Sequence, residues 1–213
     1  MSFDDLVGVW DRCREFVKAV TAGRDFSHGW YHMEQVTSTA VNIGLLSNRG
    51  SSIMQKIVLV GMLHDVNDHK YDPDGVVDEQ LRRFISTIYP EQVDLVMTTI
   101  GAISYSKEVK KGHRWFTSLL PPEWVIVRDT VSDADKLHGM GKEGIDRCIE
   151  FSRHLLRKST GEEPTDEQVI SNVKKHADEK LLRLKEHFIV TETGKFLAKP
   201  LHDQMVEMLE AFD

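Results

Sequence analysis

Residues 54–66 read MQKIVLVGMLHDV, and this stretch decides how the rest of the chain is interpreted. The segment is apolar on almost every side, and a helix of that kind belongs in the middle of a protein core. The pattern predicts a helix over residues 54–66, and His64 and Asp65, an imidazole next to a carboxylate, stand at the end of this otherwise apolar helix. Burying two such groups is unfavourable unless they are paired or bind a cation. The stretch therefore predicts a central helix with a polar site at its carboxyl end.

Helical periodicity continues on both sides of this segment. Apolar residues recur at spacings of three and four over residues 3–20, 32–47, 76–88, 91–99, 123–137, 142–158, 169–188 and 201–212. The segment YDPDG at 71–75 has the composition of a turn, and Thr165 with Gln168 forms a capping-box pattern before a helix. No strand-and-turn rhythm and no internal repeat is found in the sequence. We expect an all-α fold.

One segment lacks a sustained period. Residues 101–122 read GAISYSKEVKKGHRWFTSLLPP, and we interpret them as a long loop or partly ordered excursion. Long irregular segments in a compact domain are often functional. The part at 104–122 is a candidate for closing over a substrate.

Composition excludes several classes of protein. A formal net charge of −7 argues against a broad face for a nucleic-acid polymer. The first residues, MSFDDLVGVWDRC, do not form a signal peptide, and no run approaches the roughly 20 apolar residues of a membrane span. Cys13 and Cys148 lack the spacing of a zinc ribbon or a disulfide framework. We expect a cytoplasmic protein with free thiols.

Two further stretches supply residues that could join His64 and Asp65. In DFSHGWYHMEQV at 25–36, His32 stands at what the pattern indicates is the start of a helix. In VSDADKLHGM at 131–140, Asp133 and Asp135 stand beside apolar helix positions, and either could contribute. Neutral imidazoles and carboxylates are the ligands that divalent metals of intermediate hardness accept. The chain thus offers potential ligands from three helices, in the order H…HD…D.

This ordered set resembles the defining motif of the HD-domain metal-dependent phosphohydrolases. DFSHGWYHMEQV, LVGMLHDVNDHKY, AISY, DADKL and VKKHADEKLLRLKEHFIVTETG resemble successive blocks of the bacterial subfamily that hydrolyses nucleoside triphosphates, over about residues 25–212. The resemblance implies a single compact multi-helix HD domain over residues 1–213. Its metal-site core would lie at about 25–140, with C-terminal helices at about 142–213 packing on it.

The resemblance also implies a metal centre. It assigns one divalent ion to His32, His64, Asp65 and Asp135, with Asp135 preferred to Asp133. Mn²⁺ suits such a mixed nitrogen and oxygen site, and Mg²⁺, Co²⁺, Ni²⁺ or Zn²⁺ are alternatives. HD families with two metals need two extra histidines before the last aspartate. Only His69 and His113 lie there, and His69 is four residues from Asp65 in the same segment, so one metal is expected.

Three residues near these ligands are candidates for catalysis. Asp68 lies four residues after His64, so a continuing helix would place it on the ligand face. In similar HD nucleotidases and alarmone hydrolases a carboxylate at this position serves as the catalytic acid or base. Lys70 could meet a phosphate, and His28, one helical turn before His32, could donate to one. The plainer alternatives are a helix-end residue for Asp68 and solvated surface for Lys70 and His28.

The resemblance implies hydrolysis of a phosphoester or phosphoanhydride in a small nucleotide, first of all a (deoxy)nucleoside triphosphate. Lys136 and His138 replace the arginine and aspartate that the subfamily usually has, which leaves the substrate open. One alternative is a guanosine alarmone hydrolase, since ADKLHGM resembles that family too, although NDHK at 67–70 departs from its usual Glu-Asp pair. Another is a nucleotide-binding sensor without turnover. The oligomeric state is open.

Overall fold

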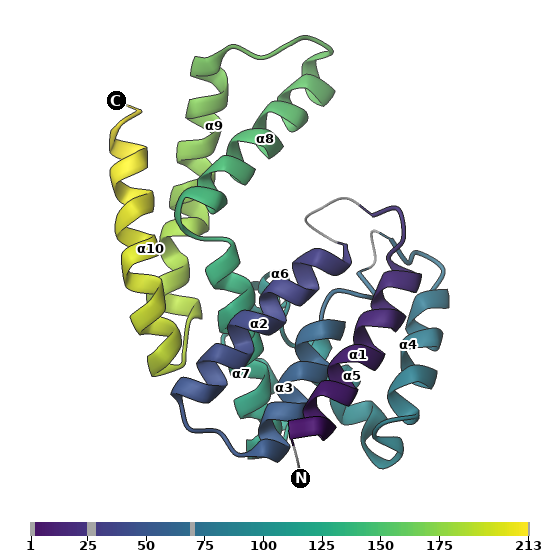
Figure 1. The fold of residues 1–213 in the computed structure, drawn as a ribbon. Coiled ribbons are helices and arrows are strands. Elements are labelled where there is room, and N and C mark those ends of the chain that lie inside the picture. The colour runs from purple at the N-terminus through teal and green to yellow at the C-terminus, as the bar shows by residue number, and fades with distance from the viewer. Residues whose placement is uncertain (1–2, 25–28, 69–70, 213) are drawn as a thin grey trace. The chain divides into compact units, whose positions relative to one another are not determined.

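The computed structural model describes residues 3–24, 29–68 and 71–212, and these form an all-α fold with no strand among them, as predicted (Figure 1). The helices are α1 (Phe3–Val20), α2 (Trp30–Leu46), α3 (Ser51–Leu63), α4 (Val76–Ser86), α5 (Val93–Gly101), α6 (Tyr105–Lys111), α7 (Pro122–His138), α8 (Gly141–Thr160), α9 (Asp166–Glu179) and α10 (Glu192–Glu210). Four short 3₁₀ or π turns connect them, η1 (Pro90–Gln92), η2 (Trp115–Ser118), η3 (Leu181–Arg183) and η4 (Leu184–Phe188).

The chain divides into two compact units, residues 1–134 and 135–213. The division falls inside helix α7, so Asp135 is the next residue of the same helix after Ala134. The single domain expected from the sequence stays a prediction.

Helix α3 is the centre of the first unit, where it packs against α1, α2 and α5. Every residue from Met54 to Leu63 is buried, which confirms the central helix predicted from the sequence. The burial includes the ammonium group of Lys56, which lies 2.9 Å from a carboxylate oxygen of Glu123 and 5.0 Å from the ring centroid of Trp124. The pair and the aromatic face together compensate the buried charge.

Helices α2 and α3 approach each other closely at Gly61. A Cβ atom added to this glycine would lie 2.8 Å from Oγ1 and 3.2 Å from Cα of Thr37. Any larger residue would therefore meet the backbone of α2. The glycine sets the spacing between the two helices three residues before His64.

Helix α3 ends at Leu63, three residues earlier than predicted, and residues 64–67 form turns. Nδ1 of His64 lies 2.7 Å from the carbonyl oxygen of Gly61, where the next backbone N–H of a continuing helix would bond. In the turns directly after His64, backbone N–H groups bond to carbonyls three residues earlier and not four. One example is the bond from the N–H of Asp68 to the carbonyl of Asp65 at 3.3 Å. Asp68 therefore lies after a turn and not on a continued helix face.

Of the two interpretations of residues 101–122, the long loop is wrong, and the partly ordered excursion agrees with the structure. The segment contains α6 and the 3₁₀ turn η2, with Ser104 capping α6 by accepting from the backbone N–H of Lys107 at 3.4 Å. A helix of seven residues is too short to show a sustained period, so the pattern could not reveal it.

The second unit contains α8, α9 and α10, with α8 packed against both of the others. Thr165 and Gln168 form the predicted capping box at the start of α9. The helix expected to reach residue 188 ends at Glu179, and η3 and η4 continue from there. Gly141 begins α8 with a φ of +67°, and a Cβ atom at this position would lie 2.9 Å from a side-chain carbon of Leu201 on α10.

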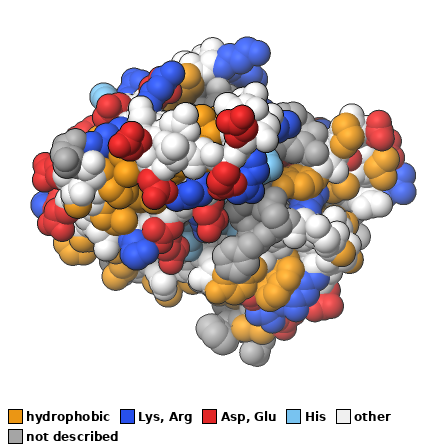
Figure 2. Space-filling model, turned by 90° about the horizontal axis from the view of Figure 1, so that it is seen from above, with side chains coloured by type: hydrophobic (Ala, Val, Ile, Leu, Met, Phe, Trp, Pro, Cys, Tyr) orange, Lys and Arg blue, Asp and Glu red, His pale blue; other side chains and the backbone are white. Residues whose placement is uncertain are grey.

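Among the described residues, none of the helices combines the length and the apolar character that crossing a membrane requires. On the face drawn in Figure 2, acidic and basic side chains are interspersed and apolar side chains lie between them.

Candidate metal centre

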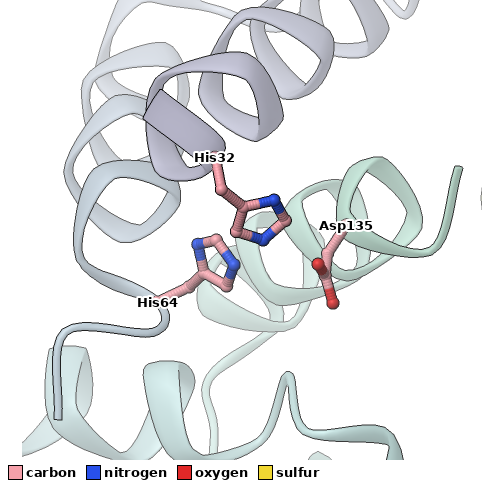
Figure 3. Close-up of side chains that lie close together, drawn as sticks. All are labelled: His32, His64 and Asp135. Carbon is pink, nitrogen blue, oxygen red and sulfur yellow. The ribbon is translucent and has the colours of Figure 1, made fainter. Parts of the chain in front are cut away.

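Three residues that the sequence separates widely come together in the structure. His32, His64 and Asp135 each offer a ligand atom, and these atoms lie within 4.8 Å of one another. Figure 3 shows the two imidazole rings and the carboxylate directed toward a common point. The two histidines are buried, and their ring centroids are 5.4 Å apart. Three of the four predicted metal ligands thus form one group.

Each of the three side chains is positioned by its helix. His32 lies in the first turn of α2, where its N–H donates to the carbonyl of Gly29 at 3.1 Å. His64 is the C-terminal capping residue of α3, and Asp135 lies near the end of α7.

The hydrogen bond of His64 fixes the role of its other nitrogen. Nδ1 lies 2.7 Å from the carbonyl oxygen of Gly61, so the neutral ring donates there and carries its lone pair on Nε2. Histidines that bind metals usually have this arrangement, in which a backbone carbonyl holds the ring orientation. His64 is therefore prepared for ligation through Nε2.

The donor set fits a divalent metal. Two neutral imidazoles with one carboxylate suit ions of intermediate hardness, and three protein ligands leave coordination positions for water or substrate. Imidazoles and a carboxylate this close together are the chemistry of a metal site, because a cation compensates their burial.

In addition to the three residues of this group, the sequence predicts roles for Asp65, Asp68, His28 and Lys70. Asp65 is half-buried and directly follows His64, but it is not part of the group of three, and its role as a ligand stays a prediction. Asp68 is half-buried, and its backbone carbonyl accepts from Tyr71 at 2.9 Å. His28 and Lys70 lie outside the described residues.

Asp133, the competitor of Asp135, is fully buried on α7 but does not belong to the group. Asp135 is the carboxylate that lies beside the two histidines, and its role as a ligand stays a prediction.

One residue at the site is absent from the sequence-based candidates. Arg24 donates through its guanidinium to the backbone carbonyls of Asp65 and Val66. Its partners lie 41 and 42 residues away along the chain. A single arginine after a helix carries no local signal of such a contact.

Comparison with known proteins gives the fold. No family model matches the chain. YpgQ of Bacillus subtilis, solved in complex with ADP, has a TM-score of 0.68 and 25% identity, covering 97% of this chain and 94% of that chain. An HD-superfamily hydrolase of Bacillus thuringiensis has a TM-score of 0.66 and 22% identity, covering 97% of this chain and 96% of that chain. The chain therefore has the HD-domain fold, and the predicted resemblance is confirmed at this level.

A comparison of sequences gives a further match. A protein of Acanthamoeba polyphaga mimivirus is 24% identical over 162 residues, which cover 68% of this chain. The match spans 63% of the mimivirus protein's own length. In this chain, the group formed by His32, His64 and Asp135 offers ligand atoms that suit a divalent metal.

Proposed function

We propose that this chain is a divalent-metal-dependent phosphohydrolase and that its substrate is a nucleotide, first of all a (deoxy)nucleoside triphosphate. The observation that carries the proposal is the meeting of His32, His64 and Asp135 within 4.8 Å in a chain with the HD-domain fold. The proposal extends from the fold to a reaction because this donor set suits a catalytic ion with open coordination positions.

The residues that would hold the ion are His32, His64 and Asp135, with Asp65 as the predicted fourth ligand. When bound, a divalent ion polarises a phosphoryl oxygen and lowers the pKa of a bound water. Mn²⁺ is favoured because the set mixes imidazole nitrogen and carboxylate oxygen.

The chain's own contribution to the reaction is assigned to residues beside the ligands. Asp68 would orient the attacking water and accept its proton, since a carboxylate that follows His64 by four residues and lies outside the ligand set could do that work. His28 and Lys70 would offset the charge that develops on the phosphate. These three roles rest on the resemblance in sequence.

A nucleotide is favoured among phosphorylated compounds because ADP is bound in the structure of YpgQ, which shares the fold over nearly its whole length. A net charge of −7 is no obstacle, since a metal and a few local donors can hold phosphates on an acidic protein. A guanosine alarmone hydrolase would use the same metal site on another substrate. A nucleotide sensor would bind without turnover.

The test is a panel of nucleotides incubated with the purified chain and Mn²⁺, Mg²⁺, Co²⁺ or Ni²⁺, with products identified by chromatography. We expect metal-dependent release of phosphate or pyrophosphate, and His64→Ala should abolish it. Release from guanosine tetraphosphate alone would instead support the alarmone hydrolase. Saturable nucleotide binding without any product would support the sensor.

A further inference from the structure

The turn that carries the His64–Asp65 pair is held by an arginine from another part of the chain. Nη1 of Arg24 donates to the backbone carbonyl of Asp65 at 3.2 Å, and Nη2 donates to that of Val66 at 2.7 Å. The guanidinium also lies over the ring of Tyr71, with Cζ 4.7 Å from the ring centroid. The planar guanidinium of Arg24 therefore donates to two successive backbone carbonyls, and one of its faces packs on the ring of Tyr71.

Arg24 reaches this position because α1 ends just before it. Gly23 has a φ of +84°, a conformation that L side chains rarely adopt, and so reverses the chain direction. The N–H of Arg24 then bonds back to the carbonyl of Thr21 at 3.1 Å. The backbone of Arg24 is thus fixed on its N-terminal side before its side chain spans the gap to the turn.

The carbonyls that Arg24 contacts follow the last turn of a helix, where backbone oxygens lose their intrahelical partners. A cation at a helix C-terminus is favourable for the same reason. Because the carbonyl of Asp65 and the side chain of Asp65 share one short segment with His64, fixing the carbonyls fixes the directions of both side chains. The rigid fork of arginine suits this task, since it sets two bonds in one plane.

We propose that Arg24 is a positioning residue of the metal centre. Its two hydrogen bonds hold the backbone of residues 64–66 so that the imidazole of His64 faces His32 and Asp135 before any ion binds. The inference deepens the proposed function, because it concerns the same site, but it predicts metal affinity and not turnover.

A matched control exists on helix α1. Nη2 of Arg12 donates to Oγ1 of Thr87 at 2.8 Å and to the backbone carbonyl of Thr87 at 3.4 Å. Arg12 therefore ties two segments of the first unit together through similar bonds at another place, namely the end of α4. Arg12→Ala reports what the loss of a purely structural arginine does.

The experiment compares the purified wild-type chain with Arg24→Ala, Arg24→Lys and Arg12→Ala, using Co²⁺ as the probe. Its visible absorption reports both affinity and ligand geometry. We expect Arg24→Ala to bind Co²⁺ about 10- to 100-fold more weakly, the usual effect of losing a group that orients metal ligands, and to show a changed spectrum. Arg24→Lys should be intermediate, and Arg12→Ala should match the wild type.

Two further measurements distinguish an effect on the position of the metal ligands from an effect on the stability of the fold. The thermal unfolding midpoint of the metal-free chain should fall by a similar amount in Arg24→Ala and Arg12→Ala. Guanidinium ion at a low, non-denaturing concentration should restore Co²⁺ affinity to Arg24→Ala and leave the other proteins unchanged. Should Arg24→Ala fail to fold, Arg24→Lys supplies the same comparison.

A wild-type affinity and spectrum in Arg24→Ala would overturn the inference, as would an equal loss of affinity in Arg12→Ala. Absence of turnover in a wild-type chain that binds Co²⁺ contradicts only the proposed reaction, because the inference is read from metal binding.

Discussion

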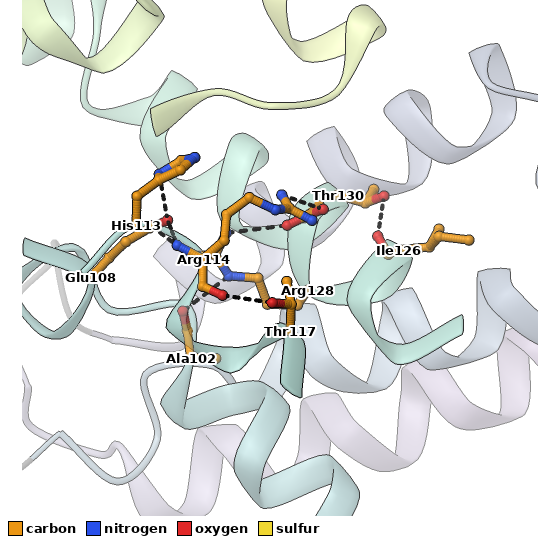
Figure 4. Close-up of polar contacts among 9 residues, drawn as sticks. Ala102, Glu108, His113, Arg114, Thr117, Ile126, Arg128 and Thr130 are labelled. Atoms are coloured by element: carbon orange, nitrogen blue, oxygen red, sulfur yellow. Dashed lines mark hydrogen bonds and ion pairs between the residues drawn. The ribbon is translucent and has the colours of Figure 1, made fainter. Parts of the chain in front are cut away.

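The guanidinium of Arg128 donates to the carboxylate of Glu108 across 2.6 Å, and neither side chain is exposed to solvent. Arg128 also donates to the carbonyl of Ala102 at 3.0 Å (Figure 4). It donates to the carboxylate of Asp129 at 3.2 Å, and its Cζ lies 4.0 Å from the ring centroid of Phe116. The pair therefore fixes the segment that contains α6 and η2 to helix α7.

Glu108→Gln should destabilise the chain strongly. The amide keeps the size of the carboxylate but leaves the buried charge of Arg128 without its closest counter-ion. Breaking a buried pair by removing one partner ordinarily costs about 3–5 kcal/mol. Urea unfolding followed by circular dichroism should show a loss of that size in the free energy of unfolding.

The matched control is Glu79→Gln on α4. Glu79 pairs with Arg83 at 3.4 Å, and both side chains are largely exposed. Exposed pairs are ordinarily worth less than about 1 kcal/mol, so this change should have little effect. Equal effects of the two substitutions would contradict the role given to the buried pair.

Gly61→Ala should weaken both folding and metal binding. The new methyl group would meet the backbone of Thr37, so α2 and α3 would have to move apart. Overpacking of this kind costs about 1–3 kcal/mol. Because His32 lies on α2 and His64 ends α3, the two ligands should also separate. The measurements are urea unfolding and titration with Mn²⁺.

Gly44→Ala tests the same pair of helices away from the site. Its methyl group would meet the sulfur of Met54, the far end of a flexible side chain that can turn aside. The substitution also gains about 1 kcal/mol of helix propensity. We expect a small change in stability and wild-type affinity for Mn²⁺. Loss of affinity in Gly44→Ala but not in Gly61→Ala would refute this account of the helix spacing.

The fold and most of the metal group could be predicted because their signals are local. The uninterrupted apolar run of α3 indicates burial, and the capping box of Thr165 and Gln168 marks the start of α9. His32, His64 and Asp135 could be chosen because their order along the chain resembles the motif of the HD-domain family, and the structure brings these three together.

What could not be predicted depends on contacts between distant parts of the chain. The early end of α3 follows from the bond of His64 to a backbone carbonyl, which no periodicity records. The order of residues 101–122 depends on Arg128, 20 residues beyond its partner Glu108. The contact of Arg24 with the turn at Asp65 has the same long-range character.

Metal binding should stabilise the chain, since a ligand that binds only the folded state raises its stability. At a concentration 100 times the dissociation constant the gain is about 2.7 kcal/mol. The thermal midpoint should therefore rise with Mn²⁺ and fall again on chelation. His64→Ala should lose this rise, and His154→Ala, on an exposed position of α8, should keep it. A thermal unfolding midpoint of the wild type that does not change on addition of Mn²⁺ would argue against the metal centre.

The stability of the chain should fall at alkaline pH partly through Cys13. Burial raises the pKa of this thiol to about 12 from 9.0, against a smaller lowering by Arg12. The folded chain thus keeps a proton that the unfolded chain releases, so the stabilisation is complete below pH 9 and is lost as pH rises toward 12.

The expected slope from this group is about 1.4 kcal/mol for each pH unit in that range. Cys13→Ala should unfold with a correspondingly smaller dependence on pH, because its folded and unfolded states no longer differ at this position. The check is urea unfolding of both proteins from neutral to alkaline pH. Parallel curves would mean that the thiol ionises equally in both states.

Substitutions of two carboxylates in one short segment, Asp65 and Asp68, should separate metal binding from catalysis. Asp68→Asn should keep the metal and lose most turnover, because the amide preserves size but cannot accept a proton near neutral pH. General acid–base roles are worth about 10²–10⁴ in rate. Asp65→Asn should lose metal affinity and activity together, since it removes a predicted ligand charge.

The comparison requires that metal content be measured before the rate on each purified variant. The structure places Asp68 after a turn, with its N–H bonded to the carbonyl of Asp65 at 3.3 Å, so the two side chains belong to one short segment. A substitution that merely disturbed this segment would change metal content in both variants. Full metal loading with wild-type turnover in Asp68→Asn would show that the residue only ends the turn and that water is activated by another group.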